Sequence, residues 1–271
     1  MKTKAVKDFY NESTDYEWSR LAQDAFHKLE FDTTMHFLKK HLPKKGLILD
    51  AGGGPGRYTI AFAKLGYDVI LFDLSPGLLA KAKKQIKKSG VEDNVKEVVQ
   101  GSIEDLGAFK DEMFDITVCL GGPISHLETE KKRKKAVSEL KRVTKKGGLV
   151  AISVIGRLAV LVLCSGFLHE EIEGTKHFKE MLLDGDDDRF RGKSFAHYFM
   201  PEEFIDLVNK SGIEIIEKVG LEGLSSHHED KINELAKNKK AWKNWLEAHY
   251  KLCTHDAVFG TSGHLLIIGK V

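Results

Sequence analysis

Hydrophobic residues in the first 155 positions form short apolar runs separated by longer segments with a helical period. The apolar runs occur at residues 47–49, 69–72, 95–99, 114–120 and 149–155. Between them, helical patterns occupy about 56–65, 76–89 and 128–144. Such runs predict buried strands and such segments predict helices. Strands that alternate with helices are joined by right-handed crossovers, so the pattern predicts an α/β protein with a doubly wound, mostly parallel sheet.

The two ends of the chain depart from this alternation. Residues 5–41 have helical spacing up to Pro43 and predict a helical N-terminal cover. Residues 157–196 contain glycines and an acidic cluster, and we expect an inserted lid in which Asp186–Asp188 form a solvated loop, with contact to a cationic substrate as the alternative. His197 follows this segment, where it either faces the active site or packs in the interior. The remaining elements are predicted as a helix at 201–211, a strand at 213–219, a helix near 229–251 and a strand at 264–269.

Together these elements predict one domain over residues 1–271 with a seven-stranded sheet whose last two strands are neighbours. A chain of this size, 42% hydrophobic, buries enough surface to fold without disulfides or metals. We expect it to comprise the helical cover (1–42), a central core (43–156), the lid (157–196) and the C-terminal part of the sheet (197–271).

Composition narrows the class of protein. The formal net charge of +2 indicates no general affinity for polyanions, and the basic run Lys131–Lys135 is expected to be a solvated helix face rather than a nucleic-acid contact. The N-terminus lacks the apolar core of a signal peptide, and the uncharged segment Leu158–Leu168 is too short to span a bilayer. The three cysteines form no C-x-x-C pair, which fits a reducing, cytoplasmic location. No histidine or cysteine spacing predicts a metal site.

A glycine loop follows the first strand of the predicted core. Gly52, Gly54 and Gly56 come directly after Asp50 and before a helix, and residues without Cβ atoms let the backbone approach a ligand closely. The spacing does not match the dinucleotide pattern G-x-G-x-x-G, because the sixth position from Gly52 is Arg57. This disfavours a nicotinamide-dependent oxidoreductase.

Asp73 ends the next predicted strand. A carboxylate at this place accepts hydrogen bonds from both hydroxyls of a ribose and repels a 2′-phosphate. The alternative is that Asp73 only caps the following helix, with Ser75 nearby. Leu120 and Gly121 end the fourth strand, at the carboxyl edge where ligands of such sheets bind.

These features resemble the class I S-adenosylmethionine-dependent methyltransferases across almost the whole chain. The glycine loop is similar to the first motif of that family, and Asp73 to its ribose-binding acid. Further similar segments are Tyr16–Leu21, Gly53–Tyr58, Gln100–Leu106, Phe114–Leu120, Gly122–Leu127, Lys146–Gly148 and His264–Leu266. The narrower resemblance is to a subgroup of small-molecule methyltransferases.

The resemblance implies S-adenosylmethionine as cofactor and S-adenosylhomocysteine as product. It implies that the glycine loop holds the methionine portion, Asp73 the ribose, and Ser102 with Ile103 the adenine. Many relatives have Asp where this chain has Ser102, which leaves the Ile103 backbone amide as the expected adenine contact. The full set of cofactor-binding residues expected is Tyr16, Arg20, Asp50, Gly52, Gly54, Gly56, Arg57, Asp73, Leu74, Ser102, Ile103, Leu120 and Gly121.

Two interpretations remain for each of three basic side chains, two of which belong to this set. Arg20 or Arg57 either pairs with the cofactor carboxylate or is an ordinary surface arginine. His126 either accepts a proton from the methyl acceptor or caps the helix that starts near Glu128.

The function we expect is methyl transfer to a small-molecule acceptor by in-line displacement. The alternatives are a methyltransferase acting on RNA or protein and a non-catalytic protein that binds S-adenosylmethionine. A DNA amino-methylase is disfavoured, because Leu120-Gly121-Gly122-Pro123 lacks the amide of the N-P-P-Y-like motif. Neither the acceptor nor the oligomeric state follows from the sequence.

Overall fold

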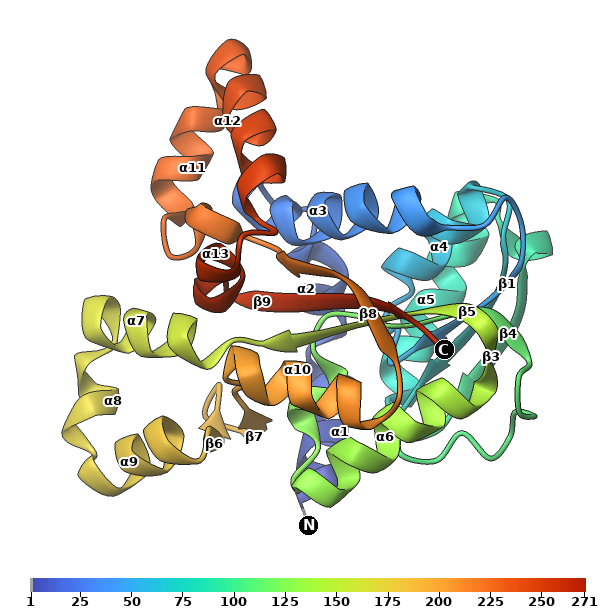
Figure 1. The fold of residues 1–271 in the computed structure, drawn as a ribbon, viewed down its shortest axis with the longest axis horizontal. Helices are drawn as coiled ribbons and strands as arrows, with labels where there is room; N and C mark the ends of the chain where they lie inside the picture. The colour runs from blue at the N-terminus through green and yellow to red at the C-terminus, as the bar shows by residue number, and fades with distance from the viewer. Residues whose placement is uncertain (1) are drawn as a thin grey trace.

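A computed structural model describes residues 2–271, in which seven strands form one sheet in the order β3-β2-β1-β4-β5-β9-β8 (Figure 1). The strands are β1 (Leu47–Ala51), β2 (Asp68–Asp73), β3 (Val95–Gln100), β4 (Phe114–Cys119), β5 (Thr144–Ile155), β8 (Glu214–Gly220) and β9 (His264–Lys270). Strands β1 to β5 are mutually parallel, and β9 runs antiparallel to both β5 and β8. This confirms the predicted doubly wound, mostly parallel sheet and the pairing of its last two strands.

Helices cover both faces of the sheet because the strands are apolar on both sides. Ile48 and Leu71 belong to a core cluster shared with α3 (Ala25–His41), α4 (Arg57–Lys64) and α5 (Pro76–Ser89). Their chain neighbours Leu49 and Phe72 belong to the opposite cluster, shared with α6 (Glu130–Val143) and α10 (Pro201–Lys210). The side chains of a strand alternate between faces, so these continuous apolar runs require cover on both sides.

Local sequence explains where α5 begins and ends. The Ser75 hydroxyl accepts a hydrogen bond from the backbone N–H of Leu78 at 3.1 Å, and Pro76 occupies the first helical turn. Gly90 follows the last helical residue in the left-handed conformation, with φ of 64°. The predicted bounds of 76–89 are therefore confirmed.

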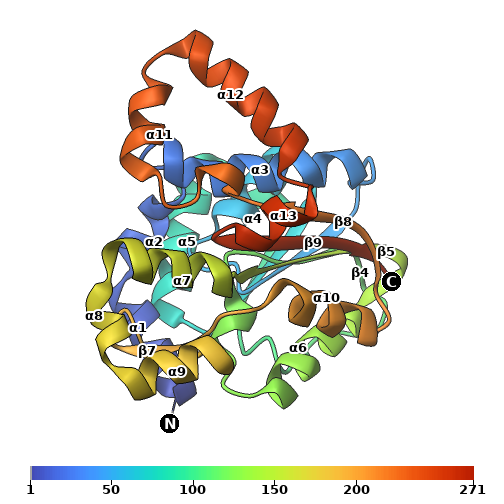
Figure 2. The same cartoon turned by 60° about the vertical axis from the view of Figure 1, so that its left-hand side comes forward.

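The predicted N-terminal cover consists of three helices. α1 (Lys2–Glu12) and α2 (Thr14–Arg20) precede α3, whose N-terminus is capped by the Asp24 carboxylate accepting from the His27 backbone N–H at 2.8 Å. Figure 2 shows α1 beside β7, on the side of the molecule where α7 to α9 project.

Residues 157–197 form three helices and a hairpin. They are α7 (Arg157–Phe167), α8 (His169–Glu173), α9 (Thr175–Leu183), β6 (Asp186–Phe190) and β7 (Ser194–His197). The expectation of a solvated loop at Asp186–Asp188 is wrong, because these residues belong to β6. Asp187 is buried and accepts a hydrogen bond from the Tyr198 hydroxyl at 2.6 Å.

His197 packs inside this region rather than facing the cavity described below. Its ring nitrogens lie 2.7 Å from Asp186 Oδ1 and 2.7 Å from Glu203 Oε1. Nearby, the buried Arg157 donates to the Tyr198 carbonyl at 2.9 Å and to the Leu183 carbonyl at 2.9 Å. Arg157 also donates to Glu203 at 3.0 Å, so these contacts tie β7, α7 and α9 to α10.

The C-terminal part departs from prediction in its helices. The single helix expected near 229–251 is two helices, α11 (Glu229–Ala236) and α12 (Lys239–Leu252), because the Asn238 side chain caps a new N-terminus. An additional helix, α13 (Asp256–Thr261), precedes β9. Short 3-10 turns complete the structure: η1 (Glu92–Asn94), η2 (Pro123–His126) and η3 (Gly223–Ser225). Within residues 2–271, no helix combines the length and the apolar character needed to cross a bilayer.

Candidate cofactor site

The glycine loop connects β1 to α4 and leaves little room for side chains. Gly52 has φ of +76°, and a Cβ atom there would lie 2.6 Å from Pro123 Cγ. A Cβ at Gly53 would lie 2.5 Å from the Asp50 carboxylate. The backbone therefore forms the cavity surface here, as a site for close approach of a ligand requires.

Asp50 supports this loop from below. It is fully buried, and its Oδ2 accepts a hydrogen bond from the Thr59 hydroxyl at 2.6 Å. Burial raises the pKa of Asp50 to about 6. Asp50 is not among the residues that line the cavity, and neither is Gly56, which caps α4 in a left-handed conformation.

Asp73 lies at the carboxyl end of β2 with its side chain in the cavity wall. Its Oδ2 accepts the Gly54 backbone N–H at 2.9 Å, and its Oδ1 accepts that of Ser75 at 2.8 Å. Burial raises the pKa of Asp73 to about 6, although both N–H groups favour the charged form. Each oxygen has further lone pairs, so the carboxylate can accept two more hydrogen bonds from a ligand.

The surrounding loops and helices enclose a cavity of about 140 Å³. Its wall contains most of the predicted residues: Arg20, Gly52, Gly54, Arg57, Asp73, Leu74, Ser102, Ile103, Leu120, Gly121 and His126. Tyr16 does not line it, because its side chain turns outward and its hydroxyl accepts from Arg191 at 3.3 Å. The cavity also contains residues of α1, among them Val6 and Tyr10, so the N-terminal helix forms its roof.

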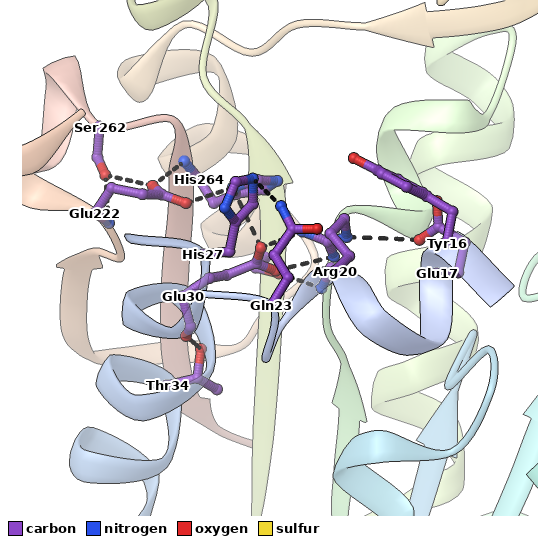
Figure 3. Close-up of polar contacts among 12 residues, drawn as sticks. Tyr16, Glu17, Arg20, Gln23, His27, Glu30, Thr34, Glu222, Ser262 and His264 are labelled. Atoms are coloured by element: carbon purple, nitrogen blue, oxygen red, sulfur yellow. Dashed lines mark hydrogen bonds and ion pairs between the residues drawn. The ribbon is translucent and has the colours of Figure 1, made fainter. Parts of the chain in front are cut away.

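The two candidate arginines differ in what their guanidinium groups already bind. Arg57 donates to the Trp18 carbonyl and lies 4.2 Å from the centre of the Trp18 ring. Arg20 forms an ion pair with Glu30 and lies 3.5 Å from Glu17 (Figure 3). A Cβ at Gly121 would lie 3.4 Å from Arg20 Nη2, so this guanidinium borders the end of β4.

A polar cluster that the sequence did not reveal continues from Glu30. Glu222 Oε1 lies 2.7 Å from His264 Nδ1, and its Oε2 accepts the Ser262 hydroxyl at 3.0 Å (Figure 3). Burial opposes the charge of Glu222, but His264 and the donors around it lower its pKa to about 2.

Glu30, Glu222 and His264 lie close enough together to be considered as metal ligands. Arg20 and His264 compensate the two carboxylates, however, so the cluster is explained as an ion-pair network. The residues come from α2, α3, β9 and the turn after β8, and no local pattern links them.

His126 ends η2 and lies in the cavity wall, as the prediction of a role near the acceptor requires. It does not cap α6, since Thr129 accepts the Lys132 N–H at that position. Its Nε2 lies 2.7 Å from the Tyr10 hydroxyl, and its Nδ1 lies 2.8 Å from the Phe195 carbonyl oxygen. Burial lowers the pKa of His126 to about 4.

These residues fit an adenosyl cofactor. The glycine loop presents backbone rather than side chains to the cavity, and Asp73 offers a carboxylate to ribose hydroxyls. The Tyr58 hydroxyl is buried in the cavity wall without a hydrogen-bond partner among the described residues, which leaves a polar group for a ligand.

Comparison with known proteins supports the same assignment. Residues 48–148 match a family model described as a methyltransferase domain. A glycine/sarcosine N-methyltransferase of Parasynechococcus marenigrum is 29% identical over 54% of this chain and 50% of its own, so the match spans about half of that relative. A ubiquinone biosynthesis O-methyltransferase of Methylococcus capsulatus is 27% identical over 70% of this chain and 71% of its own.

A solved structure shares the fold. The 1,6-didemethyltoxoflavin-N1-methyltransferase of Burkholderia thailandensis, with S-adenosylhomocysteine bound, has a TM-score of 0.58 at 14% identity over 98% of this chain and 87% of its own. Strand order and glycine loop agree with the matched family model: residues 48–148 belong to the methyltransferase domain family, within a chain that has the fold of the class I S-adenosylmethionine-dependent methyltransferases.

Proposed function

We propose that this protein transfers a methyl group from S-adenosylmethionine to a small-molecule acceptor. The observation that carries the proposal is one cavity that contains both the glycine loop and Asp73 and is roofed by α1. The names of the two relatives cited above specify glycine and sarcosine in one case and ubiquinone biosynthesis in the other, which supports a small acceptor.

The bound cofactor supplies a methyl group on a positively charged sulfur, which is displaced in line by a nucleophile. The chain's own residues then act by positioning and by excluding water. Asp73 would accept the ribose hydroxyls, and the Ile103 backbone amide, next to Ser102, would orient the adenine. Arg20 retains N–H groups beyond those that bind Glu30 and Glu17, and these would bind the cofactor carboxylate.

The roof over the cavity favours a small acceptor over RNA or protein. α1 and α2 are held against the β6–β7 hairpin by several contacts, so a macromolecular substrate would first have to displace them. The lysines Lys131, Lys134 and Lys135 of the basic run are exposed or partly exposed on α6, away from the cavity lining, whereas Arg133 is buried. We also propose a cytoplasmic location, supported by three buried cysteines that form no disulfide.

Calorimetric titration with S-adenosylmethionine and S-adenosylhomocysteine tests the cofactor. We expect micromolar dissociation constants for both, and a folded, cofactor-free sample that binds neither would overturn the proposal. Incubation with a methyl-labelled donor and fractionated metabolites, RNA and protein tests the acceptor. Label in RNA or protein, or binding without transfer to any fraction, would contradict the small-molecule assignment.

A further inference from the structure

The hydrogen-bond arrangement around His126 determines which of its ring nitrogens carries a proton. A carbonyl oxygen only accepts, so the Phe195 carbonyl at 2.8 Å requires a proton on Nδ1. A neutral imidazole then has no proton on Nε2, which must accept the hydrogen bond from the Tyr10 hydroxyl at 2.7 Å. Both ring nitrogens of His126 are therefore already engaged in hydrogen bonds within the protein before any substrate binds.

The ring is neutral at physiological pH. Burial lowers the pKa of His126 to about 4, and Arg191 adds to the lowering, while the Phe195 carbonyl opposes it. The edge-to-face contacts of its ring with Tyr10 and Phe190 hold it in place, with centroid separations of 5.4 Å and 5.1 Å.

The Tyr10 oxygen, in contrast, has acceptor capacity left. It donates its one proton to His126, and no residue between 2 and 271 donates a hydrogen bond to it. Tyr10 lines the cavity together with Gly121 and Pro123, at the end of β4. A nucleophile in this part of the cavity would therefore meet the lone pairs of Tyr10, while those of His126 are already used.

We propose that Tyr10 receives the proton of the methyl acceptor and simultaneously passes its own proton to His126 Nε2. This inference rests on the function proposed above. In this arrangement Tyr10 contacts the acceptor, and His126, positioned by the Phe195 carbonyl, is the final proton acceptor. It also requires that the methylated atom of the acceptor carry a proton, as in an O–H, N–H or S–H group.

The step balances in atoms and charge. The acceptor's heavy atom forms a bond to the methyl carbon, and the electron pair of the broken carbon–sulfur bond stays on sulfur. The acceptor's proton moves to the Tyr10 oxygen, and the Tyr10 proton moves to His126 Nε2. One positive charge disappears from sulfur as one appears on the imidazole, so the buried site gains no net charge. This offsets the low basicity of a buried histidine.

Two cofactor analogues test the proposal without knowledge of the acceptor. S-adenosylhomocysteine lacks the transferred methyl group, and sinefungin has an amine at the corresponding place. In Tyr10→Phe we expect the dissociation constant for S-adenosylhomocysteine to stay within about twofold, and that for sinefungin to rise about tenfold, because the amine loses its acceptor. The matched control is Tyr67→Phe, whose hydroxyl binds the Pro43 carbonyl outside the cavity and should affect neither ligand.

An unchanged ratio of the two dissociation constants in Tyr10→Phe would overturn the inference, and so would a joint loss of both affinities. A wild-type protein that fails to bind S-adenosylhomocysteine would instead contradict the proposed function. Nitrogen-15 spectra of histidine-labelled protein give a second measurement, independent of variants. We expect His126 to carry its proton on Nδ1 with S-adenosylhomocysteine bound, and a proton on Nε2 would refute the proton path, since Tyr10 could not donate to it.

Discussion

At the level of single residues, Asp73 is the side chain on which we expect cofactor affinity to depend most. On the proposed assignment, Asp73→Ala would remove two charge-assisted hydrogen bonds to the ribose, each contributing about 1.5–3 kcal/mol. We therefore expect the dissociation constant for S-adenosylhomocysteine to rise at least about tenfold, which corresponds to 1.4 kcal/mol. Calorimetry measures it, with Asp68→Ala at the other, partly exposed end of β2 as the matched control. Equal affinity of Asp73→Ala and wild type would refute the assignment.

The raised pKa of Asp73 predicts how this affinity depends on pH. Burial places the pKa at about 6, above the ordinary 3.8, so the carboxylate gains a proton as the pH falls through 6. A protonated carboxyl accepts hydrogen bonds poorly, and at pH 5 only about one tenth of it is ionised. S-adenosylhomocysteine should bind about tenfold more weakly at pH 5 than at pH 7.5. In Asp73→Asn this dependence should largely vanish, and its persistence would assign it to another group.

At the scale of the element, the β6–β7 hairpin holds the N-terminal helices over the cavity. Lys193 pairs with Glu12 of α1 at 3.2 Å, and Arg191 pairs with Glu17 of α2 at 3.4 Å. Each exposed pair contributes little by itself, but both resist the opening of the same roof.

The double variant Arg191→Gln, Lys193→Gln should therefore release S-adenosylhomocysteine about fivefold faster than wild type. Stopped-flow displacement measures the rate, with Lys210→Gln on α10 as an exposed control. High salt should accelerate release from wild type and have less effect on the double variant, because the screened ion pairs are already absent. Equal release rates at low salt would show that the hairpin does not retain the roof.

At the scale of the whole molecule, the Glu222 cluster joins the two ends of the chain. Glu222 and His264 flank the C-terminal strands, and Glu30 and Arg20 belong to the N-terminal helices. Glu222→Ala leaves buried donors and a histidine without their carboxylate, which costs about 3 kcal/mol in the free energy of unfolding.

We expect the midpoint of thermal unfolding of Glu222→Ala to fall by about 6–10 °C. The control Glu234→Ala removes an exposed carboxylate of α11 and should change the midpoint little. Because the pKa of Glu222 is lowered to about 2 by the fold, its contribution is present above pH 4.5 and lost as the pH falls toward 2. A difference between wild type and Glu222→Ala that does not shrink on acidification would contradict this origin.

The doubly wound, mostly parallel sheet, the glycine loop after β1 and the position of Asp73 at the end of β2 were all predictable from the sequence. These depend on interactions between near neighbours in the chain, namely the alternation of apolar residues and the Ser75 cap before Pro76. The sequence pattern did not predict the helix break at Asn238. It also predicted a solvated loop where β6 lies, because three consecutive aspartates are atypical of a strand, and only the folded chain brings the Tyr198 hydroxyl to the buried Asp187.

Contacts between side chains that are distant in the sequence could be identified only from the tertiary structure. Tyr10 and His126 are 116 positions apart, and the partners of the β6–β7 hairpin on α1 and α2 lie more than 170 positions away from it. Periodicity shows that a segment has a buried face, yet it does not specify the segment that covers that face. The proton state of His126, the outward turn of Tyr16 and the ion-pair network around Glu222 all follow from packing between such segments, so they became visible only once the chain was folded.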